Sequence, residues 1–201
     1  PTSRLHIPKN EREYRQSPDK AIWRTTRELK MDAYNALNIY RLVPLSEVPK
    51  ESRVMGSLWV HGTKPDPKRP GSLMPTGRWC VKGTQMEHEI YESYFDCMMS
   101  VTLNIMYCLY AAYSKYLKGA VADIDNFFQS TRTDTKAAAE EKLPRLFCQQ
   151  PPDFEKYGPN GEKLVAEILV ALQGRIDAGR ISGQRLYKLI MAIDGIRQSD
   201  W

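Results

Sequence analysis

The sequence has few cysteine and histidine residues, and they form no metal-binding pattern. Its four cysteines include no Cys-x-x-Cys pair, and its three histidines are widely separated among 201 residues. Structural zinc sites need several such ligands at short, regular spacings. A zinc site is therefore not expected, and we interpret the cysteines as buried, reduced thiols of an intracellular protein.

Glycine-rich phosphate-binding loops are also absent. The sequence contains no Gly-x-Gly-x-x-Gly motif, no P-loop and no internal repeat, so a dinucleotide-binding fold is not expected. No secretory apolar segment opens the chain, which starts at Pro1 with a basic, polar stretch over residues 1–17. We interpret this stretch either as an extended arm that lies on a partner or as the remnant of a removed targeting segment.

Charged residues are missing from one stretch, Cys97 to Ser114, with the sequence CMMSVTLNIMYCLYAAYS. Its length is close to that of a membrane span. Ser100, Thr102 and Asn104 dilute its apolar character. The pattern therefore favours a buried helix over residues 97–117, and no membrane span is expected.

Hydrophobic periodicity predicts two further helices. The first follows Ser17, a plausible N-cap, with Pro18 at its first helical position. The second begins near Ser182. Short strand-like runs separate the helices, so the expected fold class is α+β, with an antiparallel sheet packed on helices. The buried stripes are expected to hold Ala21, Ile22, Leu29, Ala33 and Leu37 in the first helix, and Leu186, Leu189, Ile190 and Ile193 in the second.

Positive charge is in mild excess, with a formal net charge of +5, which permits an anionic partner without requiring one. Two strands near residues 53–63 and 77–82 are expected to form a hairpin, joined by a linker rich in Pro, Gly and Lys. This hairpin is either a solvated loop or a flexible finger that contacts phosphates. Its cations are Lys64, Lys68, Arg69, Arg78 and Lys82.

The stretch GAVADIDNFFQS, residues 119–130, carries two acids that are two positions apart. If it forms a strand, the carboxylates of Asp123 and Asp125 share one face, because alternate residues of a strand point the same way. The pair is then a candidate for a metal site that acts on phosphates. The alternative is the solvated edge of a sheet.

From residue 18 to residue 201 the chain resembles the reverse transcriptases of copia-type LTR retrotransposons (Pseudoviridae). Single motifs are weakly specific, but seven of them occur in the family's order. The resemblance implies a right-hand polymerase fold, with residues 18–201 as fingers and a truncated palm, and residues 1–17 as a basic arm. The motifs are AIWRTTRELKMDAYNALNIYRLVPL, GSLWVHGTK, GRWCVKGTQ, YFDCMMSVTLNIM, VADIDNFFQS, LFCQQPPDF and LQGRIDAGRISGQRLYKLIMAIDGIRQSDW.

The resemblance assigns roles to individual residues. An aspartate of the family's first palm strand binds two Mg²⁺ ions and corresponds to Asp123, and the carbonyl of Ile124 would also face a metal. Phe128 falls where the family has an aromatic residue beneath the sugar. Arg78 and Lys82 would lie near template or triphosphate phosphates.

The chain departs from the family pattern at positions that serve chemistry. The YxDD motif, which carries the other two catalytic carboxylates, is expected beyond Trp201 and does not occur in the sequence. Asp177 stands where the family has a Gln against the incoming nucleotide, and would repel a triphosphate. Phe127 replaces a small alanine beside the aromatic gate and should crowd it. Asp125 matches no family metal ligand and is interpreted as incidental.

These departures favour a catalytically inactive, reverse-transcriptase-derived domain that needs no cofactor. It would serve as an RNA-binding or scaffold subunit of a larger ribonucleoprotein or organellar complex. One alternative is a portion of an active RNA-directed DNA polymerase, with Mg²⁺ as cofactor, whose YxDD segment lies outside this chain. Another is an unrelated globular protein with an accidental likeness. A truncated palm exposes apolar surface, so a protein partner is expected there, with RNA as a second candidate partner. The expected location is intracellular: organellar after import, or cytoplasmic or nuclear for a retroelement product.

Overall fold

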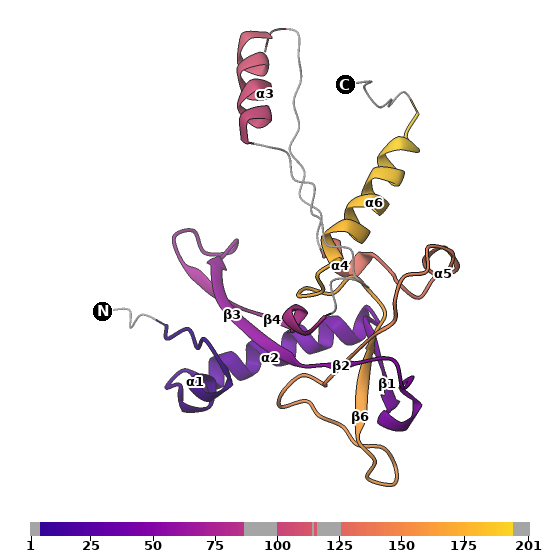
Figure 1. The fold of residues 1–201 in the computed structure, drawn as a ribbon. Helices are drawn as coiled ribbons and strands as arrows, with labels where there is room; N and C mark the ends of the chain where they lie inside the picture. The colour runs from indigo at the N-terminus through magenta and orange to yellow at the C-terminus, as the bar shows by residue number, and fades with distance from the viewer. Residues whose placement is uncertain (1–4, 87–99, 114, 116–125, 195–201) are drawn as a thin grey trace.

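The computed structural model of this chain describes residues 5–86, 100–113, 115 and 126–194. The described part is a mixed α/β structure in which two sheets pack against helices (Figure 1). In chain order its elements are α1 (Glu11–Gln16), α2 (Lys20–Ala36), β1 (Tyr40–Pro44), the 3₁₀ helix η1 (Leu45–Glu47), β2 (Val54–Met55), β3 (Ser57–Pro65), β4 (Leu73–Val81), the 3₁₀ helix η2 (Gly83–Gln85), α3 (Ser100–Tyr113), α4 (Phe127–Ser130), α5 (Lys136–Glu140), β5 (Leu146–Cys148), β6 (Leu164–Ile168) and α6 (Ala178–Met191).

One sheet has four strands in the order β1-β6-β5-β2, and the other is the β3–β4 hairpin. Strand β6 pairs antiparallel with both β1 and β5, whereas β2 and β5 run parallel. The expected α+β class, with a sheet packed on helices, is therefore confirmed. The sheet is mixed rather than purely antiparallel, because the chain between β2 and β5 is long enough to return to the same end.

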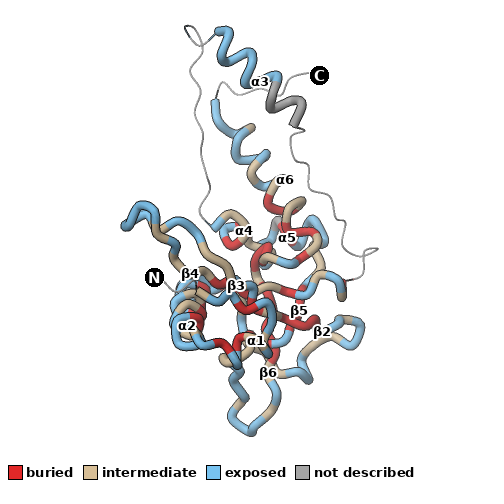
Figure 2. Tube along the Cα trace, turned by 90° about the vertical axis from the view of Figure 1, so that its left-hand side faces the viewer, coloured by how far each residue is buried: buried red, intermediate tan, exposed pale blue. Residues whose placement is uncertain are grey.

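The predicted hairpin forms with different strand bounds: β3 starts and ends later than expected, and β4 starts four residues earlier. Trp59 and Trp79 stand opposite each other in the register, and both indoles are buried. Cross-strand aromatic pairs stabilise a sheet, and this pair lies in the main core. Strands β3 and β4 then continue outward as far as Pro65 and Leu73, so the loop shrinks to residues 66–72. Figure 2 shows burial concentrated where the hairpin meets β5 and β6.

Helix α2 forms where it was expected, but the prediction of its buried face was wrong. It begins at Lys20 rather than at Pro18, because Ser17 instead ends α1 and accepts a hydrogen bond from the Asp19 amide at 3.1 Å. The residues expected to be buried are exposed: Ala21, Ile22, Leu29, Ala33 and Leu37. The buried stripe is instead Trp23, Arg27, Met31 and Tyr34. Because this stripe contains Arg27, the buried face of α2 looks polar in the sequence.

The expectation of an extended arm over residues 1–17 was wrong for its second half. Residues 11–16 form α1, and Asn10 caps it by accepting a hydrogen bond from the Glu13 amide at 2.9 Å. Tyr14 is buried, and the indole of Trp23 donates to the carbonyl of His6 at 2.8 Å. This segment therefore packs on α2, while the domain boundary near residue 17 stays a prediction.

A close backbone approach connects the hairpin to the segment before α6. The amide of Val81 donates to the carbonyl of Gln173 at 3.0 Å, and Gly174 follows with φ of +89°. A β-carbon at Gly174 would overlap the Val81 carbonyl oxygen. Glycine is needed here for both the backbone conformation and the space.

The prediction of a buried helix over residues 97–117 was wrong in the part that can be described. Helix α3 exists, but its residues 105–113 are all exposed, and Figures 1 and 2 show it apart from both sheets. Helix α6 also differs from expectation, since Ser182 is buried inside it and Leu189, Ile190 and Ile193 are exposed. Within the described ranges, no helix combines the length and apolar character that crossing a membrane requires.

Candidate functional site

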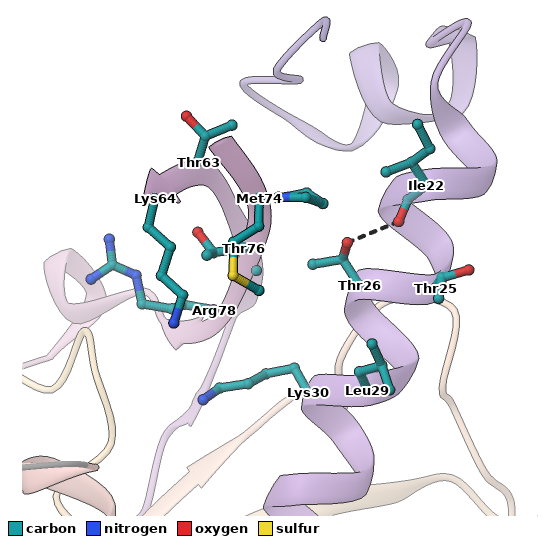
Figure 3. A pocket seen from close by; sticks show the side chains of 12 residues that line it. Ile22, Thr25, Thr26, Leu29, Lys30, Thr63, Lys64, Met74, Thr76 and Arg78 are labelled. Atoms are coloured by element: carbon teal, nitrogen blue, oxygen red, sulfur yellow. Dashed lines mark hydrogen bonds between the residues drawn. The ribbon is translucent and has the colours of Figure 1, made fainter. Parts of the chain in front are cut away.

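A groove of about 810 Å³ lies between α2 and the outer half of the β3–β4 hairpin (Figure 3). One wall comes from the solvent-facing side of α2, which presents Ile22, Thr26, Leu29 and Lys30. These positions are four, three and one residues apart, so they share one face of the helix. Two of the five residues that sequence reasoning had placed in the core, Ile22 and Leu29, therefore form part of the wall of a surface groove.

The opposite wall comes from the outer part of the hairpin. Lys64 pairs with Met74, and Arg78 pairs with Val60 four residues further along β4. All twelve lining residues are described, and none carries an acidic side chain or an aromatic ring. The groove is therefore positively charged through Lys30, Lys64 and Arg78, with apolar and threonine side chains around them.

Lys30 is the least exposed of these three cations. It is half-buried, and its Nζ lies 4.9 Å from the centre of the Tyr34 ring. Burial lowers the pKa of Lys30, and the nearby charges of Lys64 and Arg78 lower it further. In the described part of the chain no carboxylate lies within ion-pair distance of any of the three. An anion that enters the groove would relieve this repulsion.

The structure brings together two of the five cations expected on the hairpin. Lys68 and Arg69 lie at its turn, where Asp66 accepts from the Lys68 amide and from the Arg69 guanidinium, each at 2.9 Å. These two contacts, the amide first, lower the pKa of the Asp66 carboxyl. Lys82 lies past the other end of β4, where its amide donates to the Gly56 carbonyl at 2.9 Å. None of the three lines the groove.

Sequence reasoning missed Lys30. It lies eight residues after Ile22 and four after Thr26, so its place on their face of the helix could have been read from helical spacing. The signal was overlooked because that face was expected to pack inside the protein. What the sequence could not show is that β4 approaches α2 along this face.

The residues expected to form a metal site cannot be placed. Asp123, Ile124 and Asp125 lie outside the described residues. Phe127 and Phe128 follow in the short helix α4 rather than in a strand, so the expected strand does not extend through them. Their ring centres are 5.4 Å apart. Within the ranges that the structure describes, no three His, Cys, Asp or Glu side chains come together as a metal site would require.

A second charged cluster surrounds Arg27, but it is closed to ligands. The Arg27 guanidinium is fully buried and donates to Glu11 at 2.8 Å, to Asp153 at 2.9 Å and to His61 Nε2 at 3.1 Å. It also lies 3.5 Å from the centre of the Tyr14 ring. Burial, and then the charge of Arg27, lowers the pKa of His61 to about 4, so His61 stays neutral and accepts. The cluster connects α1, α2, β3 and the loop after β5.

Asp177 is likewise unavailable to a ligand. Its carboxylate and the Arg175 guanidinium are both fully buried and form a two-pronged ion pair with distances of 2.7 and 2.9 Å. Arginine and carboxylate groups match in this geometry. Asp177 therefore serves the packing at the start of α6.

Comparisons of this chain with protein-family models, with curated proteins and with solved structures found no match.

Proposed function

We propose that this chain is a reverse-transcriptase-like domain that binds nucleic acid, with RNA as the favoured ligand, and does not itself polymerise. The observation that carries the proposal is the groove between α2 and the hairpin. It gathers Lys30, Lys64 and Arg78, and no described carboxylate neutralises them. Lysine and arginine contacts to phosphate supply most of the sequence-independent affinity of proteins for nucleic acids.

The burial of Asp177 supports the proposal that the chain does not polymerise. In the resemblance this position belongs to a glutamine that lies against the incoming nucleotide. Here Asp177 is buried and held by Arg175 in an ion pair. The change from glutamine also removes a polar contact to a nucleotide, which a polymerase would need.

A scaffold role is favoured by a separate observation. Large apolar side chains are exposed on α3 and α6, including Ile105, Leu109, Leu189 and Ile190. Exposed apolar surface of this kind marks protein interaction sites. We therefore infer that a protein partner covers these helices, as expected for a truncated palm.

The RNA-binding proposal is tested by measuring fluorescence anisotropy of a labelled single-stranded RNA with the whole chain. The triple variant Lys30→Gln, Lys64→Gln and Arg78→Gln should bind at least about tenfold more weakly at low salt. Because each phosphate contact contributes about 0.7 to the salt slope for single strands, the slope of log K against log salt should fall by about 2. Lys50→Gln removes one exposed charge that does not line the groove and serves as the control.

Three results would overturn the proposal. The first is that the wild-type protein does not bind RNA at low salt, and the second is that the triple variant binds RNA as tightly as the wild type. The third is extension of a primer by the purified chain with Mg²⁺ and deoxynucleotides, which would establish the polymerase alternative. Circular dichroism of each variant checks that the fold is retained.

A further inference from the structure

Two of the three groove cations converge from opposite walls of the groove. In Figure 3 the side chain of Lys64 runs down the hairpin wall and that of Lys30 reaches toward its end from α2, whereas the Arg78 guanidinium turns away from α2. The lowered pKa of Lys30, caused in part by the other two cations, fits this proximity.

The paired charges of Lys30 and Lys64 are better matched to one multiply charged group than to a run of singly charged phosphodiesters. Each internal phosphodiester carries a single negative charge. A phosphomonoester carries a charge close to −2 at neutral pH and presents three terminal oxygens. The two ammonium groups, one from each wall, can contact those oxygens together, and charge-assisted hydrogen bonds of this kind are the stronger ones.

The rest of the groove can hold the terminal nucleoside of a nucleic-acid strand without selecting a particular base. Ile22, Leu29, Met74 and Pro75 give it an apolar lining, and threonine hydroxyls lie among them. Its described lining has no aromatic ring, and stacking on aromatic rings is the usual way in which proteins hold unpaired bases. Recognition therefore has to come from the charged group.

We propose that the groove binds the terminal phosphomonoester of a nucleic-acid strand, with the phosphate held between Lys30 and Lys64 and the adjoining nucleoside against the apolar lining. This inference rests on the proposed nucleic-acid binding and names the part of the ligand that the groove takes. Binding of the terminal phosphate in the groove does not depend on which base the strand carries at that end.

The experiment compares RNA oligonucleotides of one sequence that differ at their ends. One has hydroxyl groups at both ends, one has a 5′-phosphate and one has a 3′-phosphate. Affinity is measured by competition against a single labelled strand, so that no label blocks an end. At least one phosphorylated strand should bind about tenfold or more tightly than the hydroxyl-ended strand, and the stronger one identifies the end that enters.

Variants link this preference to the groove. Lys30→Gln and Lys64→Gln, made separately, should each reduce the preference for the phosphorylated end to about threefold or less, whereas Lys50→Gln should leave it unchanged. Equal binding of all three strands, still weakened by the groove variants, would overturn this inference and leave the proposed function standing. Failure of every strand to bind would overturn both. A preference that survives both lysine variants would place the phosphate elsewhere and contradict the assignment.

Discussion

Replacing Arg27 by methionine should destabilise the protein by about 2–4 kcal/mol. The guanidinium is fully buried and holds two carboxylates, one imidazole and one aromatic ring. Breaking a buried ion pair by removing one partner costs about 3–5 kcal/mol. The cost should be lower here, because Glu11 and Asp153 are 31% and 22% exposed and can be rehydrated. Methionine also keeps much of the packing of the arginine stem.

Urea unfolding followed by tryptophan fluorescence measures this change, since Trp59 lies 5.4 Å from the Arg27 guanidinium and Trp23 contacts its partner His61. The matched control is Arg24→Met on the same helix. Arg24 is 42% exposed and pairs with Glu28 at 2.7 Å, so its loss should cost less than about 1 kcal/mol. Hydrogen exchange adds a local readout, because α1 should exchange faster in the Arg27 variant. A cost for Arg27→Met no larger than that for Arg24→Met would refute the reasoning.

Two further predictions concern pH and self-association. The pKa of His61 falls from 6.5 to about 4 on folding, so the unfolded chain binds the extra proton as pH drops. Stability contributed by neutral His61 is complete above pH 6.5 and is lost toward pH 4; between pH 7 and pH 5 the loss should be about 1 kcal/mol after discounting for partial exposure. His61→Gln should show a flatter pH dependence in urea unfolding over this range, and an equal slope in both proteins would contradict the assignment. The exposed apolar residues of α6 predict that the isolated chain self-associates at high micromolar concentration, and that Ile190→Glu reduces this more than Gln184→Glu does. A monodisperse monomer in light scattering would count against the inferred protein partner.

Local sequence signals were sufficient for several elements. The β3–β4 hairpin was expected from its strand-like runs and its Pro- and Gly-rich linker, and it forms with its turn at residues 66–72. Helix α2 and the C-terminal helix α6 were likewise expected from their periodicity. Turn residues and side-chain periods act over short distances, so a single segment carries enough information.

The candidate site was predicted only in part, for a physical reason. Lys64 and Arg78 were expected to face phosphates, and the structure places both in one groove. Lys68, Arg69 and Lys82 were expected beside them but lie elsewhere. Side chains on one hairpin point to both of its faces and spread over its length. Which of them meet depends on the helix that covers the hairpin.

The sequence by itself determined that α2, α6 and the β3–β4 hairpin form, and that the chain carries a mild positive excess. Tertiary structure decided which face of α2 is buried. Arg27 can enter the core because Glu11, Asp153 and His61, which are remote in sequence, satisfy its donors. That burial turns Ile22, Leu29 and Lys30 outward and makes the groove. The cost of burying a charge depends on the partners that folding supplies, and no local pattern in the sequence records them.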